Sequence, residues 1–313
     1  MSRYVVFDSH CDTASELWRK GQSLTQTDCM VSLSQAEKFA GYGQFFAFCP
    51  LPGMTKESEY ENLFWSPYRY FMALLEQHKD QITLCTNAEQ YQTAISQHKT
   101  AAFLSLEGAE GICCDPGRVE ELRQAGISMV NLTWNADNAL AGCSHRNGPG
   151  LSKQGREFVR NAQKCGILVD VSHISDAAFW DLIDLTERPL VASHSNARAL
   201  CGHSRNLTDE QYLAICRTGG YVGINLYSLF LSDDGQADLD TVYRHMDHFL
   251  TLGGEHVALG GDLDGCDQLP VQFYGLRDYQ ALAYYLENRG YSEETIHNIF
   301  SKTMEKVVTL CTM

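Results

Sequence analysis

Side chains that can bind a metal ion recur at one kind of place in this sequence, directly after short apolar runs. Five runs end this way, and the positions are His10 with Asp12, Glu107, His173, His194 and Asp262. Imidazole nitrogens and carboxylate oxygens are common donors to zinc. Each position alone is explained as well by a hydrogen-bonded histidine or a paired carboxylate. Together they predict one shared site, because the whole chain contains only 11 histidines.

The apolar runs are themselves the elements that must position these side chains. They are rich in β-branched and aromatic residues and lie at 4–7, 45–48, 101–106, 128–132, 167–171, 190–193, 221–226 and 257–260. Nearly continuous apolar runs are typical of strands buried on both faces, as in a parallel sheet. The stretches between them show helical periodicity, for example at 120–125, 176–183 and 240–250. We therefore predict alternating strands and helices.

Eight strands alternating with helices over about 300 residues predict an α/β fold of the (β/α)8 barrel type. A doubly wound open sheet is the alternative. We expect residues 1–313 to form a single hydrolase domain, because no linker or low-complexity tract divides the chain. Residues 50–98 are expected to be an elaborated loop with helices after the second strand.

A barrel of this type places its chemistry at the carboxyl ends of the strands, where the candidate ligands occur. His10 and Asp12 are two residues apart, so a strand would present both on one face. His173 and His194 follow consecutive strands and should be neighbours at the rim. Gly260 and Gly261 precede Asp262, and their lack of a side chain allows the backbone to approach closely.

Composition excludes several classes of function. The formal net charge is −15 and the pI is about 5.1, which argues against a nucleic-acid backbone or an anionic membrane as partner. We expect no signal peptide, because residues 1–10 contain no long apolar segment, and no apolar run in the sequence is long enough to span a membrane. The twelve cysteines lie mostly within apolar stretches, so we expect reduced, buried thiols and a cytoplasmic protein.

The motifs taken together resemble those of a known family. The segments that carry the likeness are His10-Cys-Asp12, Ser105-Leu-Glu-Gly108, and the stretches 169–176, 192–206 and 260–265. They resemble the membrane (renal) dipeptidase family of the amidohydrolase superfamily, from residue 7 to about residue 300. The resemblance implies a zinc-dependent hydrolase of short unblocked dipeptides. It also implies a homodimer.

The resemblance further implies a binuclear zinc site. By the family's pattern, His10 and Asp12 would bind one ion, and His173 and His194 would bind the other. Glu107 would bridge the two. Such a pair of ions lowers the pKa of a shared water and polarises the scissile carbonyl.

The remaining implied roles concern the substrate. Asp262 matches the acid/base aspartate of the family, and Arg205, with Asn206, matches the group that binds the C-terminal carboxylate of the dipeptide. An arginine suits that task because its planar fork meets a carboxylate with two hydrogen bonds. Trp134 stands where the animal enzymes have a histidine that contacts the substrate, and it can donate only its indole N–H.

Two alternatives remain open at this stage. The first is a related amidohydrolase that acts on N-acyl amino acids or on cyclic, β-lactam-like amides. This alternative stays open because Trp134 differs from the histidine of the animal enzymes. The second is a catalytically silent metal-binding protein on the same scaffold. That protein would lack a ligand or Asp262, whereas this chain has all six positions.

Overall fold

A barrel of parallel strands forms the centre of the molecule. The computed structural model describes residues 2–49 and 57–311. The strands are β1 (Val5–Cys11), β2 (Gly41–Phe48), β3 (Ile82–Leu84), β4 (Thr100–Glu107), β5 (Ile127–Asn131), β6 (Leu168–Asp170), β7 (Leu190–Val191), β8 (Val222–Ile224) and β9 (Val257–Leu259). Eight of them are hydrogen-bonded in the order β7-β6-β5-β4-β2-β1-β9-β8, and each pair is parallel.

The two ends of this strand order meet and nearly close the barrel. A parallel bridge joins Ala192, just after β7, to Val222 at the start of β8. Three backbone hydrogen bonds support the junction: Ala192 to Tyr221, Gly223 to Ala192, and Ser195 to Gly223, at 2.8–3.0 Å. Every strand predicted from the apolar runs is present, and the predicted barrel is confirmed.

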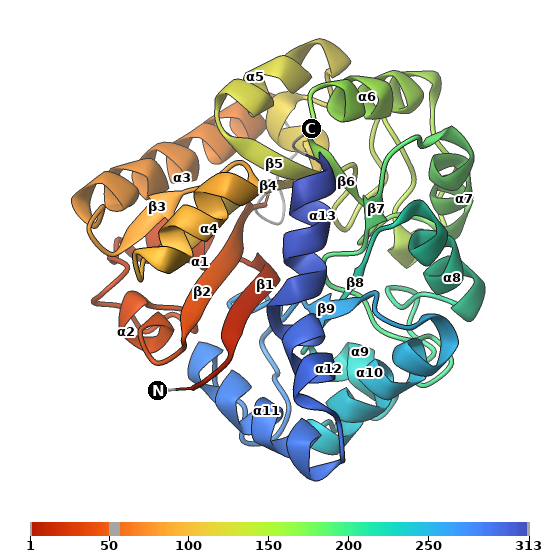
Figure 1. The fold of residues 1–313 in the computed structure, drawn as a ribbon. Coiled ribbons are helices and arrows are strands. Elements are labelled where there is room, and N and C mark those ends of the chain that lie inside the picture. The colour runs from red at the N-terminus through yellow and green to blue at the C-terminus, as the bar shows by residue number, and fades with distance from the viewer. Residues whose placement is uncertain (1, 50–56, 312–313) are drawn as a thin grey trace.

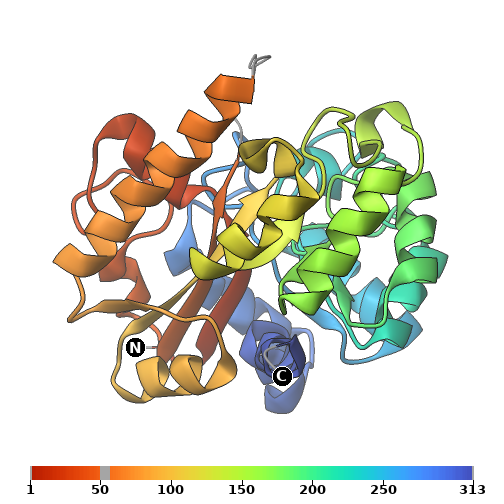
Figure 2. The same cartoon turned by 90° about the horizontal axis from the view of Figure 1, so that it is seen from above.

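Helices surround the barrel on its outside (Figures 1 and 2). They are α1 (Thr13–Lys20), α2 (Leu33–Ala36), α3 (Glu57–Gln77), α4 (Ala88–Ser96), α5 (Val119–Gln124), α6 (Lys153–Lys164), α7 (Asp176–Leu185), α8 (Asp209–Thr218), α9 (Ser228–Leu231), α10 (Leu239–Gly253), α11 (Tyr279–Asn288), α12 (Glu293–His297) and α13 (Thr303–Cys311). Short 3₁₀ turns lie at Ala109–Ile112, Pro116–Arg118, Ser144–Arg146 and Leu276–Asp278, and a π-helical turn at Asn298–Lys302. None of the helices in the described ranges combines the length and apolar character that crossing a membrane requires.

The predicted insert after the second strand contains α3, the short strand β3 and α4, and its residues 50–56 lie outside the described ranges. Strand β3 was not predicted. It pairs with residues 100–102 at the start of β4, on the edge that pairs with β5 from Leu104 onward. Its three residues follow the polar stretch 77–81 and are too few to give a recognisable strand pattern.

The inside of the barrel is packed with side chains from seven of the strands and from Tyr221, directly before β8. The inward-facing residues are Phe7, Phe45, Phe103, Met129, Leu168, Val191, Tyr221 and Ala258. Three aromatic rings stack here, with the Phe103 centroid 5.3 Å from Phe7 and 5.1 Å from Phe45. Helix α13 crosses the end of the barrel where the strands begin, and its Met304 and Val307 join this cluster (Figure 1). The other end of the barrel is therefore the one left for polar chemistry.

Eleven of the twelve cysteines have described side chains, and no disulfide joins any two of these eleven. Seven of these are buried. This agrees with the prediction of small apolar residues rather than a disulfide framework.

Candidate metal centre

Glu107 lies between three histidines at the carboxyl end of the barrel. Its Oε1 atom is 2.9 Å from His173 Nε2 and 3.4 Å from His194 Nε2. Its Oε2 atom is 3.6 Å from His10 Nε2. The carboxylate ends β4 and is 2% exposed, so its two oxygens point in different directions within a buried site.

His10 and Asp12 reach this site from the end of β1. His10 Nε2 is 3.6 Å from Asp12 Oδ1 and 3.7 Å from Asp262 Oδ1. The neighbouring strand end is held against them by backbone hydrogen bonds from Asp12 to Leu263 and from Asp262 to His10, at 2.9 and 3.2 Å. A Cβ on Gly260 would lie only 1.9 Å from the carbonyl oxygen of Ser193, so this packing requires a glycine.

His194 is oriented by a buried relay. Its Nδ1 is 2.7 Å from Ser193 Oγ, which donates to Asp170 in a short hydrogen bond. Because the serine proton goes to the carboxylate, Ser193 Oγ accepts from His194, and the proton of the neutral ring lies on Nδ1. His194 Nε2 therefore keeps its lone pair for a ligand.

His173 and Asp262 adopt left-handed backbone conformations, with φ of 72° and 53°. Non-glycine residues in this region are uncommon and cost about 1–3 kcal/mol each when strained. Each lies three residues beyond the end of a strand, His173 after β6 and Asp262 after β9. Asn225, after β8, donates to Asp262 Oδ2 at 3.0 Å, which leaves Oδ1 facing His10.

The site concentrates negative charge. Burial, together with the charge of Glu107, raises the pKa of the Asp12 carboxyl to about 7. Burial likewise raises the pKa of Asp262. Although burial opposes it, the carboxylates of Glu107 and Asp12 raise the pKa of His10 well above its usual range. Several buried carboxylates crowded together are the environment that a bound cation relieves.

The spacing of these atoms fits metal binding. A tetrahedral zinc ion with bonds of about 2.0–2.2 Å has ligand atoms about 3.3–3.6 Å apart. His173 Nε2 and His194 Nε2 are 3.0 Å apart, and the other separations given above are 2.9–3.7 Å. His10 Nε2 and Asp12 Oδ1 are buried without a hydrogen-bond partner. Three overlapping groups of ligand atoms result: His10, Asp12 and Glu107; Glu107, His173 and His194; and His10, His194 and Asp262.

Arg205 lies beside this centre and is 3% exposed. Its Nη2 donates to the carbonyl oxygen of His194 at 3.3 Å, and its guanidinium stacks on Phe230 at 5.4 Å. Its Nε has no hydrogen-bond partner, and burial lowers the pKa of the group. A buried guanidinium with an unused donor is suited to an anionic ligand.

Asn206 and Trp134 are placed differently. The amide nitrogen of Asn206 donates to the carbonyl oxygens of Cys201 and Phe230, so these bonds hold the loop that carries Arg205. Trp134 is half-buried on the loop after β5. The substrate-binding roles of both residues stay predictions.

Three residues around the candidate ligands were not assigned roles in the sequence analysis. Asp170 and Ser193 support His194, and Asn135 Oδ1 lies 2.9 Å from His173 Nδ1. The sequence could have identified Asp170, because a carboxylate within an apolar strand is costly to bury unless it is paired. Asn135 lies on a loop with no pattern that identifies it.

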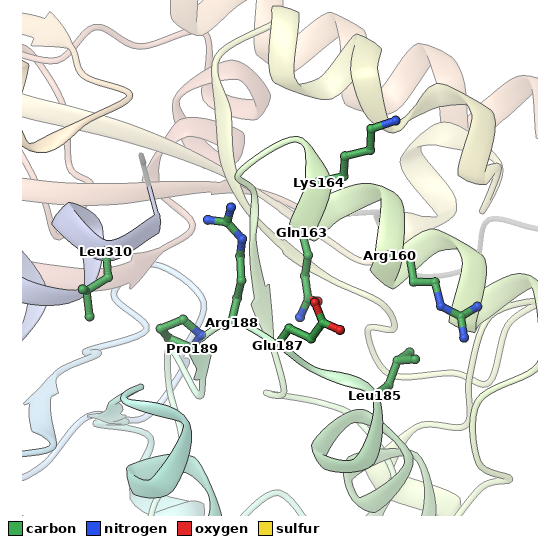
Figure 3. Close-up of a pocket in the computed structure, with 8 residues that line it drawn as sticks. All are labelled: Arg160, Gln163, Lys164, Leu185, Glu187, Arg188, Pro189 and Leu310. Carbon is green, nitrogen blue, oxygen red and sulfur yellow. The ribbon is translucent and has the colours of Figure 1, made fainter.

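A separate cleft of about 920 Å³ lies near the end of α13, and none of the candidate metal ligands lines it. Figure 3 shows the residues that line it: Arg160, Gln163, Lys164, Leu185, Glu187, Arg188, Pro189 and Leu310. It contains one carboxylate and no histidine. This cleft is therefore not a second metal centre.

Comparison with known proteins identifies the family. A family model described as membrane dipeptidase, peptidase family M19, matches residues 1–310. The chain belongs to this family. It is accordingly a metallodipeptidase, a hydrolase that acts on peptide bonds.

Individual relatives support the assignment. The chain is 31% identical over 259 residues to an uncharacterized protein in the pqqA 5′ region of Klebsiella pneumoniae, covering 79% of this chain and 95% of that protein. It is 30% identical over 213 residues to an uncharacterized dipeptidase of Schizosaccharomyces pombe, covering 66% of this chain and 52% of that protein.

Solved structures share the fold. A crystal structure of dipeptidase AC, a metallopeptidase of family M19, has a TM-score of 0.93 and 25% identity, with 99% of both chains covered. A metallopeptidase from Rhodobacter sphaeroides, liganded with a phosphinate mimic of the dipeptide L-Ala-D-Ala, has a TM-score of 0.93 and 24% identity. That match covers 99% of this chain and 100% of the neighbour.

Proposed function

We propose that this chain, as one hydrolase domain over residues 1–313, is a zinc-dependent dipeptidase with a binuclear site that hydrolyses short unblocked dipeptides. The observation that carries the proposal is the position of Glu107. One of its oxygens faces His173 and His194, and the other faces His10. A carboxylate in that position is suited to bridge two cations about 3.5–4 Å apart.

The ligand groups divide into two sets around this carboxylate. His10 and Asp12 would hold one zinc ion, and His173 and His194 the other. When bound, two such ions lower the pKa of a shared water and polarise a carbonyl. The chain contributes buried, preoriented ligands, since His194 already has its Nε2 lone pair directed at the site through the Ser193 relay.

Asp262 is proposed to move the proton. Its Oδ2 is held by Asn225 at 3.0 Å, and its Oδ1 is 3.7 Å from His10 Nε2. Burial raises its pKa, which makes the carboxylate a better base. It would take a proton at Oδ1 from the attacking water and return it to the leaving amine nitrogen.

The substrate's carboxylate end is proposed to bind Arg205, and substrate-binding roles are also proposed for Asn206, the next residue on the same loop, and for Trp134, on the loop after β5. The guanidinium is already stacked on Phe230 and bonded to the His194 carbonyl, so little conformational freedom is lost when a carboxylate arrives. The free ammonium end would meet the acidic side of the site, formed by Asp12 and Asp262.

Removal of metal tests the proposal. The purified chain is assayed with L-Ala-L-Ala, L-Ala-D-Ala, N-acetyl-alanine and a cyclic amide, before and after dialysis against a chelator. We expect hydrolysis of free dipeptides only, loss of activity on chelation, and recovery with two zinc ions per chain. Full dipeptide hydrolysis after exhaustive metal removal would refute the mechanism, and hydrolysis of the acylated or cyclic amides alone would refute the substrate class.

We also propose a cytoplasmic location, supported by the finding that the eleven described cysteines form no disulfide with one another. Free thiols persist in reducing compartments. The predicted homodimer stays a prediction.

A further inference from the structure

The loop after β5 surrounds His173. Ser144 donates its backbone N–H to the His173 carbonyl oxygen at 2.8 Å, and Thr133 Oγ1 donates to the same oxygen at 3.3 Å. Cys143 and Ile174 form an antiparallel bridge. The backbone of this ligand is therefore tied to one loop, which also carries Trp134 and Asn135.

Asn135 lies on this loop and contacts two imidazole rings with a single atom. Its Oδ1 is 2.9 Å from His173 Nδ1 and 3.0 Å from His145 Nε2. An amide oxygen only accepts hydrogen bonds, so both ring nitrogens must donate. The proton of a neutral His173 is thereby placed on Nδ1, and its Nε2 lone pair is directed toward Glu107.

The two histidines of this metal set are thus oriented in different ways. His194 relies on Ser193 and Asp170, which are both fully buried. His173 relies on Asn135, whose side chain is exposed at the mouth of the barrel. His145 in turn donates to Asn135, which limits the rotation of the amide.

We infer that Asn135 is a positioning residue, which sets the orientation and proton position of His173 and so controls zinc affinity at the His173–His194 side of the site. The inference rests on the proposed function, because it takes His173 to be a ligand. Partners of this kind typically change metal affinity or activity by about 10–100-fold when removed.

The test measures zinc binding rather than turnover. Asn135→Ala, Asn135→Asp and His145→Ala are titrated with zinc against a competing chelator, and Asn138→Ala serves as the control. Asn138 lies in the same loop but bonds to Glu110 and the Leu132 carbonyl, away from His173. Thermal unfolding of each variant verifies that it is folded.

We expect Asn135→Ala to lower the affinity for one of the two zinc ions by about 10–100-fold and to leave the affinity for the other unchanged. Asn135→Asp retains an acceptor oxygen and should restore affinity to within about threefold, and His145→Ala should have a smaller effect than Asn135→Ala. At saturating zinc, the KM of Asn135→Ala for dipeptides should equal that of the wild type.

Three outcomes would overturn the inference. One is unchanged zinc affinity in Asn135→Ala, another is failure of Asn135→Asp to rescue, and the third is an equal loss in Asn138→Ala, which would assign the effect to loop order. A wild-type chain that binds no zinc at all would instead refute the proposed function, so the two failures are distinguishable.

Discussion

The two ends of the barrel are built on opposite principles. At the end where the strands begin, aromatic and aliphatic side chains such as Phe7 and Phe103 stack under Met304 and Val307 of α13. At the other end, His10 Nε2, Asp12 Oδ1 and Arg205 Nε are buried without hydrogen-bond partners. Left-handed backbone conformations at His173 and Asp262 also lie at this end.

The difference between the two ends explains how the fold stays stable despite the energetic cost of its polar site. Buried unpaired polar atoms and left-handed residues each cost about 1–3 kcal/mol. The dense packing at the opposite end offsets such costs through apolar burial. Substitutions at the polar end should therefore affect mainly activity, and substitutions at the apolar end should affect mainly the free energy of unfolding.

The largest effect is expected for Glu107→Gln. The amide cannot carry the negative charge that faces all three histidines, so zinc content should fall below two ions per chain. We expect kcat/KM for L-Ala-L-Ala to fall by about 10³-fold or more, as is usual when a group central to catalysis is removed. Metal analysis and steady-state kinetics measure both quantities. A variant that retains two ions and full activity would contradict the bridging role.

The next effect is on stability, at the opposite end. Phe103→Ala removes a ring that is 0% exposed and should lower the free energy of unfolding by about 3–5 kcal/mol. Urea unfolding of the zinc-loaded protein measures this loss. Because the ring belongs to the interior cluster that packs against α13, kcat at low temperature should change by less than about threefold. Tyr284→Ala, at a residue 55% exposed, is the control and should change stability by less than about 0.5 kcal/mol.

A smaller effect is expected for Arg205→Ala, which should raise the KM for free dipeptides. A hydrogen bond to a charged group contributes about 1.5–3 kcal/mol, or roughly 10–150-fold. Arg205→Lys keeps the charge but loses the planar guanidinium, so its KM for free dipeptides should lie between those of the wild type and Arg205→Ala. The C-terminal amide L-Ala-L-Ala-NH₂ lacks the carboxylate, and its kinetics should not respond to either change. An equal response of acid and amide would show that Arg205 acts on the site's structure instead.

Much of the fold was predictable because it depends on local patterns. The apolar runs marked all eight barrel strands, since strands buried on both faces need nearly continuous apolar sequence. Strand β3 was missed because three residues carry no pattern of their own, and its pairing depends on a free stretch of β4 edge.

The site was predictable in part. The candidate ligands stood out because polar residues directly after buried strands are costly unless they are paired or bound. Asn135 could not be found this way. It is one polar residue in a polar loop, and its importance comes from a 2.9 Å contact with a histidine 38 positions away.

The sequence by itself determined the alternation of strands and helices, the barrel and the set of metal-competent residues, because these follow from residue type and spacing along the chain. Only the tertiary structure decided which oxygen of Glu107 faces which histidine, and which groups orient His173 and His194. Those relations depend on strand register and loop packing across the barrel, and hydrogen-bond geometry at that scale is not encoded by any local pattern.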